Sequence, residues 1–417
     1  MEDRKELYDK REQRLKDAIQ LKETDCVPIS ALLQGYAVTD SGHTMAEAIY
    51  DYEVARKATI WFAEHYQPDM LSDYTFAFYG KGKMLDLMRL EKVDWAGRPG
   101  GRVPANSIHQ FLESTTLTDD EMDYFNRDYT GWMFRCGLPR VSKVLQPLSQ
   151  LNNLFSGPVY DFTYLCSDMS TPEFKAMMET IWKINDMNNE VLAKIQDMEG
   201  ELRDLGYPTP IQGYATVPLD DYGAAVRSTQ DCLMDLFDNE ETVLNFCAQH
   251  LEGQIASLKE QGLYLAGKWA VIYLTKSSDT FMGSGQFEQF YWKDLRRLIE
   301  EIQKNGMIPY IYTEGPYNSR LEYLKDVPPG VIYHFEDTVD MKRAKQILGG
   351  HACISGGFPI GLLLYGKKEQ VADKCKQLID DCAPGGGYIF ETASGFDEAI
   401  RENVETMYET VKEYGKR

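Results

Sequence analysis

The fold is decided by residues 331–357, whose sequence is VIYHFEDTVDMKRAKQILGGHACISGG. The stretch begins with a short apolar run at 331–335, has apolar residues at helical spacing over 341–348, and ends with a second apolar run at 352–355. Short apolar runs are typical of buried strands, and the 3.6-residue spacing between them is typical of a helix. This order predicts one repeat of a parallel sheet covered by helices.

The same alternation extends over most of the chain. Further strands are predicted at 27–38, 68–78, 210–217, 269–275, 307–313 and 387–392, and further helices at 286–304, 319–324 and 368–381. Strands that alternate with helices over 417 residues predict an α/β protein with a (β/α)8 TIM barrel.

The amino-terminal half differs from this pattern in two ways. Residues 6–21 place apolar residues at helical spacing among alternating charges, which predicts an amphipathic helix before the barrel. We therefore divide the chain into an N-terminal helical extension, 1–24, and a barrel, 25–417. The segments 93–102 and 152–164 contain glycine and proline and predict long loops.

The charge balance limits the possible partners. The chain has 44 Lys and Arg against 65 Asp and Glu, a net charge of −21, which excludes a nucleic-acid binder because such affinity depends on cations that contact phosphates. No run approaches the roughly 20 apolar residues of a membrane helix, and the charged first residues do not resemble a secretion signal, so a cytoplasmic location is expected. The eight cysteines contain no C-x-x-C pair, which favours reduced thiols.

Candidate functional residues stand at the predicted strand ends. In a TIM barrel the chemistry takes place at the carboxyl-terminal ends of the strands, which we call the barrel mouth. Tyr312 and Glu314 are two residues apart, and so are His334 and Glu336, so each pair points to one face of its strand. The other residues at such ends are Gln34, Tyr36, Asp73, Lys276 and Glu391. The sequence therefore predicts an acidic and aromatic mouth.

Several of these segments resemble the uroporphyrinogen decarboxylase superfamily. The resemblance is strongest over 331–357 and continues through LLLYG at 362–366, APGGGYI at 383–389 and Glu402-Asn403 in the closing helix. Earlier segments agree in order more loosely. This superfamily includes the decarboxylase itself and methyltransferases linked to corrinoid proteins, and the resemblance implies a TIM barrel.

The decarboxylase is one alternative within the superfamily. That branch is known for arginines just after the first strand, which hold a substrate with many carboxylates. Here residues 32–36 are LLQGY, and no Arg or Lys follows before Arg56. Arginine supplies the paired donors that carboxylates need, so decarboxylation of a polycarboxylate is disfavoured.

The methyltransferase branch is the better match. Its thiol-using members carry zinc on a His-x-Cys pair at a strand end and a Cys near the last strand, whereas this chain has Tyr312, Glu314 and Ser394 at about those positions. The chain is more similar to the O-demethylase methyltransferase I enzymes. They pass a methyl group from a donor such as an aryl methyl ether to the Co(I) corrinoid of a separate protein. The resemblance implies a small methylated substrate, a cobalamin-binding partner protein and, as is common in this superfamily, a homodimer.

The acidic residues of the mouth permit three roles. Glu314, His334 and Glu336 offer oxygen and nitrogen ligands of the kind that bind Zn²⁺. Glu314 or Glu336, crowded by other acids, would alternatively be a general acid for the leaving group. The third alternative is that both glutamates only pair with Lys276, Arg320 or Arg343.

The remaining candidates concern the substrate. Tyr312 and Tyr36 are predicted to stack on or hydrogen-bond an aromatic donor, with Gln34 and Lys276 beside them. Asp73 stands where the superfamily has a functional acid, and its alternative role is a helix N-cap. A binding module that has lost catalysis is the remaining hypothesis, because the cysteine ligands are absent.

Overall fold

The computed structural model describes residues 3–72, 78–151 and 162–416. Eight parallel strands in this part of the chain form the barrel, and each overlaps one predicted run. They are β1 (Ser30–Ala31), β2 (Met70–Leu71), β5 (Ile211–Tyr214), β6 (Trp269–Leu274), β7 (Ile308–Thr313), β8 (Ile332–Phe335), β9 (Cys353–Gly356) and β10 (Tyr388–Ile389). The predicted (β/α)8 TIM barrel is confirmed.

Hydrogen bonds follow the strands around the barrel. Strands β5 to β10 pair in sequence order, each parallel to the next. Strand β10 continues to β1, because the amide of Ser30 donates to the Phe390 carbonyl at 2.9 Å. Strand β1 pairs with β2, and the Leu71 amide donates to the Pro208 carbonyl just before β5 at 3.1 Å. The pair β1–β2 therefore closes the barrel, with β1 beside β10 and β2 beside the start of β5.

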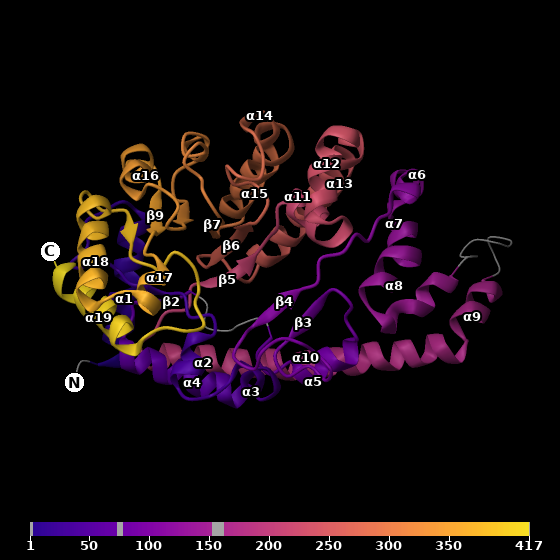
Figure 1. Cartoon of the computed structure of the whole chain (residues 1–417), viewed down its shortest axis with the longest axis horizontal. Helices are drawn as coiled ribbons and strands as arrows, with labels where there is room; N and C mark the ends of the chain where they lie inside the picture. The colour runs from indigo at the N-terminus through magenta and orange to yellow at the C-terminus, as the bar shows by residue number, and fades with distance from the viewer. Residues whose placement is uncertain (1–2, 73–77, 152–161, 417) are drawn as a thin grey trace.

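Helices cover the outside of these strands, as Figure 1 shows for α12 to α16 and α18. The helices of the barrel half are α11 (Pro218–Asp221), α12 (Thr229–Asp238), α13 (Glu240–Gly262), α14 (Ser284–Phe287), α15 (Lys293–Lys304), α16 (Met341–Leu348), α17 (Ile360–Tyr365), α18 (Lys368–Cys382) and α19 (Arg401–Tyr414). Those of the first half are α1 (Arg4–Ile19), α2 (Tyr36–Asp40), α3 (Met45–Tyr50), α4 (Tyr52–Tyr66), α5 (Gly82–Met88), α6 (Met122–Arg127), α7 (Tyr129–Trp132), α8 (Leu138–Val141), α9 (Thr163–Met169) and α10 (Pro172–Asp204). In the described part of the chain no helix has both the length and the apolar character needed to cross a membrane.

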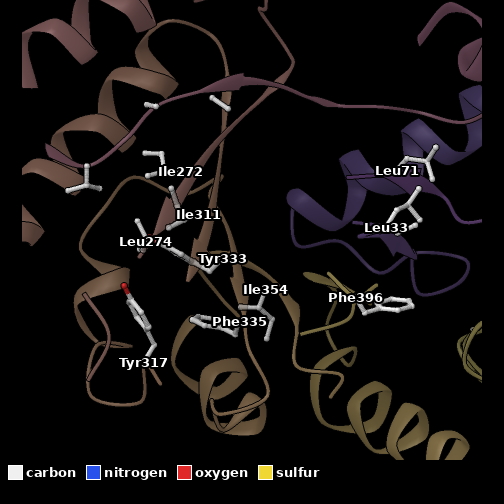
Figure 2. Close-up of a cluster of buried hydrophobic side chains, with 14 of the residues drawn as sticks. Leu33, Leu71, Ile272, Leu274, Ile311, Tyr317, Tyr333, Phe335, Ile354 and Phe396 are labelled. Carbon is white, nitrogen blue, oxygen red and sulfur yellow. The ribbon is translucent and has the colours of Figure 1, made fainter. Parts of the chain in front are cut away.

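The outward faces of the strands form the larger core. Ile272 of β6, Ile311 of β7 and Ile354 of β9 point toward the helices, and each is fully buried. Figure 2 shows these side chains together with Leu33, Leu71 and Phe396 from the segments that flank the barrel closure. Because parallel strands are covered on both sides, their sequences are nearly continuous apolar runs, which is why the runs were predictable.

A smaller core fills the inside of the barrel. Helix α1 packs Leu15, Ala18 and Ile19 against residues such as Trp269 and Ile308, which begin β6 and β7 at the amino-terminal ends of the strands. The predicted amphipathic helix is thus confirmed, and it covers the end of the barrel opposite the mouth. Because α1 covers the amino-terminal ends of the strands, the functional site is expected at their carboxyl-terminal ends.

Glycine permits the turn that follows β9. Gly356 has φ +88°, and a Cβ there would lie 2.2 Å from the Phe335 carbonyl oxygen. Any side chain would separate β8 from β9 and disturb the strand ends of the mouth.

Two predicted elements differ in the structure. The loop predicted at 93–102 contains β3 (Val93–Trp95), which pairs in antiparallel fashion with β4 (His109–Phe111), a partner beyond the predicted segment. The helix predicted at 319–324 is wrong, since the described structure has turns there and a short 3-10 helix, η6 (Tyr323–Lys325). Arg320 accounts for this difference, because its buried guanidinium donates to the Met282 carbonyl at 2.5 Å and so fixes the segment by a tertiary contact. Most of the loop predicted at 152–164 lies outside the described residues.

The first half of the chain adds a helical cap. The 33-residue helix α10 is capped by Thr171, whose hydroxyl accepts from the Phe174 amide at 3.2 Å. Its first turns pack Phe174 and Met177 against Leu148 of η3 (Lys143–Gln150) and Leu151 just after it, and these residues form a small separate core. Helices α6 to α8 stand beyond this core, at the far end of α10 from the chain termini (Figure 1).

Candidate active site at the barrel mouth

A fully buried carboxylate joins strands from opposite ends of the sequence. Glu391, just after β10, accepts hydrogen bonds from Ser30 at 2.5 Å and Ser72 at 2.8 Å on one oxygen. Its other oxygen accepts from Tyr310 at 2.7 Å and contacts His334 Nδ1 at 2.8 Å. Burial alone would raise the pKa of this carboxyl, but His334 and the hydroxyl donors outweigh it and hold the pKa below its ordinary value. Glu391 is therefore a charged centre that positions the strand ends.

His334 is engaged on both sides of its ring. Nδ1 faces Glu391, and Nε2 lies 3.0 Å from the carbonyl oxygen of Ala393. Each ring nitrogen thus faces a hydrogen-bond acceptor, and neither nitrogen has a free lone pair that could bind a metal ion. Across residues 3–72, 78–151 and 162–416, no group of three or more His, Cys, Asp and Glu side chains is arranged to hold a metal. In this arrangement Glu314, His334 and Glu336 do not fit a zinc ligand set, and zinc binding stays a prediction.

A row of tyrosines lines one side of the mouth. The ring of Tyr312 stacks on His334 with centroids 4.3 Å apart and planes at 12°. Tyr273 follows at 5.1 Å from Tyr312, and Tyr214 at 6.4 Å from Tyr273. Tyr312 is buried, whereas Tyr273 and Tyr214 are 37% and 51% exposed, so the row leads from the barrel interior to the surface. Tyr312 therefore lies at the mouth, and its contact with an aromatic substrate stays a prediction.

Glu314 and Glu336 stand at the ends of β7 and β8. Glu336 accepts a hydrogen bond from the Gly315 amide at 2.9 Å, whereas the Glu314 carboxyl forms no hydrogen bond within the described residues. Burial, and then the charges of Asp220 and Glu336, raise the pKa of Glu314 to about 7. Neither glutamate forms an ion pair with Lys276, Arg320 or Arg343 in the described structure, and Arg320 instead lies 3.6 Å from Asp279. Glu314 is therefore a carboxyl group that exchanges its proton near neutral pH.

Asp220 is a site residue that the sequence analysis missed. It is buried at the end of α11 and accepts hydrogen bonds from Tyr291 at 2.6 Å and Thr275 at 2.9 Å. Burial raises its pKa to about 6 despite these donors. The sequence contains a signal for this residue, because Asp220 closely follows the predicted strand at 210–217.

The other predicted residues are more scattered. Lys276 lies beside the mouth, with its ammonium 3.4 Å from Thr229 and 6.0 Å from the Phe281 ring centroid. Gln34 has φ +43°, and its carbonyl accepts from Tyr79 at 2.8 Å.

Tyr36 does not lie at the mouth. It is 2% exposed and packs its ring 4.8 Å from Phe396 in the outer core, so its side chain has no free surface for a ligand. Asp73 lies outside the described residues.

The closed barrel, its buried carboxylate centre and its acidic, aromatic mouth define a TIM-barrel protein with functional groups at the carboxyl-terminal strand ends. Residues 159–414 match the family model described as Uroporphyrinogen decarboxylase (URO-D), and because this is more than half of the chain, the chain belongs to that family.

A comparison with curated proteins gave no match. Among solved structures the chain is similar to a methyltransferase from Methanosarcina mazei, with a TM-score of 0.60, 14% sequence identity, and coverage of 97% of this chain and 98% of that one. At this identity the likeness shows a shared fold over almost the whole length.

Proposed function

We propose that this protein is a methyltransferase that moves a methyl group from a small donor, preferably an aryl methyl ether, to the Co(I) corrinoid of a separate protein. The observation that carries the proposal is the Glu314 carboxyl, which holds a proton near neutral pH beside an aromatic wall. The fold shared with the Methanosarcina mazei methyltransferase supports this branch of the family.

The leaving group needs help from the protein. Loss of a methyl group from an aryl ether leaves a phenolate, whose negative charge develops in the transition state. The corrinoid supplies the nucleophile, so this chain needs only to bind the donor, orient it and supply a proton. Tyr312 and Tyr273 offer faces for an aromatic ring, and Glu314 would donate its proton to the ether oxygen as the carbon–oxygen bond breaks.

The neighbouring acids keep that proton available. A carboxyl group with an ordinary pKa would be ionised at neutral pH and could not act as a general acid. Burial and the charges of Asp220 and Glu336 prevent this at Glu314. The same acidity opposes the alternative function, decarboxylation of a polycarboxylate, because Glu314, Glu336 and Asp220 would repel such a substrate.

Methyl transfer can be tested directly. The purified protein is incubated with a Co(I) corrinoid protein and a panel of methoxyarenes, methylamines and methyl thiols, and formation of the methylated corrinoid is followed by its absorbance. We expect turnover with methoxyarenes, reduced 10²- to 10⁴-fold in Glu314→Gln, which is the usual contribution of a general acid.

Glu322→Gln is the matched control, since Glu322 is an exposed glutamate outside the mouth. We expect it to retain the wild-type rate. The proposal fails if no donor in the panel methylates the corrinoid, and the role of Glu314 fails if its Gln variant is as active as the control.

The other expectations belong to this proposal. Metal analysis of the wild-type protein and of Glu314→Gln would test the predicted zinc site. Sedimentation would test the homodimer, and cell fractionation the cytoplasmic location.

A further inference from the structure

A second group of polar and aromatic side chains lies next to the mouth. His250 of α13 places Nε2 2.7 Å from Asp221 Oδ2, at the end of α11. Thr216 donates to the same oxygen, and Gln254 in turn donates to Thr216 at 2.9 Å. None of these residues takes part in the methyl-transfer step proposed above.

These residues line a cavity between the barrel and the cap. Its volume is about 430 Å³, enough for a single-ring aromatic molecule, and its other walls come from β5, α13, α7 and the π-helical segments η2 (Met133–Gly137) and η4 (Tyr222–Val226). His250 also lines a smaller cavity of about 200 Å³. Tyr214 belongs both to the larger cavity and to the tyrosine row, so the cavity lies beside the barrel mouth.

The walls of the cavity are suited to a flat ring. Phe246 stacks on His250 with centroids 5.2 Å apart and planes at 13°, and Tyr129 meets Phe246 edge to face at 5.7 Å. Tyr214 adds an exposed ring, and Met133 and Val141 complete the apolar wall. Aromatic side chains arranged in this way favour an aromatic ligand.

Two polar side chains of the cavity, His250 and Asp221, carry hydrogen-bond acceptor atoms. Asp221 accepts from His250, so the neutral imidazole carries its proton on Nε2 and its lone pair on Nδ1. Nδ1 has no hydrogen-bond partner among the described residues and is accessible to solvent. A ligand group that contacts Nδ1 must therefore donate a hydrogen bond, and the carboxylate of Asp221 disfavours an anion.

We propose that this cavity, formed around His250 and Asp221, is a binding site for a neutral aromatic molecule with an O–H or N–H group, such as a phenol. The ring stacks among Tyr129, Tyr214 and Phe246, and the hydroxyl donates to His250 Nδ1. The choice of a phenol as the ligand rests on the proposed function, because a phenol is what remains when an aryl methyl ether loses its methyl group.

Binding is measured without any methyl transfer. Fluorine NMR titrations at pH 8 compare 4-fluorophenol with 4-fluorotoluene, which lacks the donor, and with 4-fluorobenzoate, which is an anion. We expect the phenol to bind most tightly. His250→Phe keeps the ring and removes the nitrogen, so it should weaken phenol binding about tenfold, the usual effect of one hydrogen bond.

The matched control is His65→Phe on α4. His65 stacks on Trp61 at 5.0 Å and 13°, much as His250 stacks on Phe246, but it is remote from the cavity. We expect phenol binding unchanged in this variant. His250→Gln, tested in parallel, keeps a polar side chain if the Phe variant does not fold, and it should also weaken binding because it cannot reproduce the position of Nδ1.

Equal affinity of wild type and the folded His250 variants for 4-fluorophenol would overturn the inference, and so would equal binding of phenol and benzoate. Phenol binding that depends on His250, in a protein that transfers no methyl group, would instead support the site and refute the proposed function. The two ideas can therefore fail separately.

Discussion

Replacement of Glu314 by Gln should change how stability depends on pH. The carboxyl pKa is raised from 4.5 in the unfolded chain to about 7 in the native protein. Between these values the native state holds a proton that the unfolded state has lost, so this group lowers the free energy of unfolding as the pH rises. The full effect, present above pH 7, is about 3 kcal/mol, since each pKa unit corresponds to about 1.4 kcal/mol.

Glutamine has nearly the same shape but cannot ionise. The free energies of unfolding of wild type and Glu314→Gln are measured by urea denaturation at pH 5 and pH 8. We expect the variant to gain about 2 to 3 kcal/mol relative to wild type between the two pH values, because only wild type must bury a charge at pH 8. Any pH-independent change in the free energy of unfolding caused by the amide is the same at both pH values and cancels in this comparison.

Glu322→Gln provides the control for this measurement. Its side chain is exposed, so we expect a change within about 0.5 kcal/mol at either pH. If Glu314→Gln and wild type lose stability in parallel from pH 5 to pH 8, Glu314 does not carry a raised pKa. The general-acid role would then lose its physical basis.

Three other changes test the rest of the site and fold. Asp220→Asn removes a charge that raises the pKa of Glu314. In a pH–rate profile, the pH above which methyl transfer is lost should therefore fall by on the order of one unit. An unshifted profile would show that Asp220 does not affect the pKa of Glu314. Glu391→Ala removes the buried acceptor that Ser30, Ser72, Tyr310 and His334 share and should cost about 3 to 5 kcal/mol in urea denaturation, whereas a loss below 1 kcal/mol would contradict its central role. Leu15→Ala removes part of the packing between α1 and the barrel and should cost about 2 to 5 kcal/mol, while the exposed Leu263→Ala should change the free energy of unfolding by less than about 0.5 kcal/mol.

The sequence by itself determined the barrel. Its strands are covered on both sides, so each appears as a short apolar run, and residues 331–357 alone contain β8, α16 and β9 in the predicted order. The strand ends also followed from the pattern, which is why Tyr312, Glu314 and Glu336 were found without a structure. Where a tertiary contact overrides local spacing, as Arg320 does near η6, the prediction failed.

Only the tertiary structure decided what these residues do. Glu391 and Ser30 are 361 positions apart and meet because the barrel closes between β10 and β1. That closure engages His334 on both nitrogens, and the burial it creates gives Glu314 a pKa near neutrality. Burial and charge–charge distance depend on the whole fold, and no local pattern of residues records them.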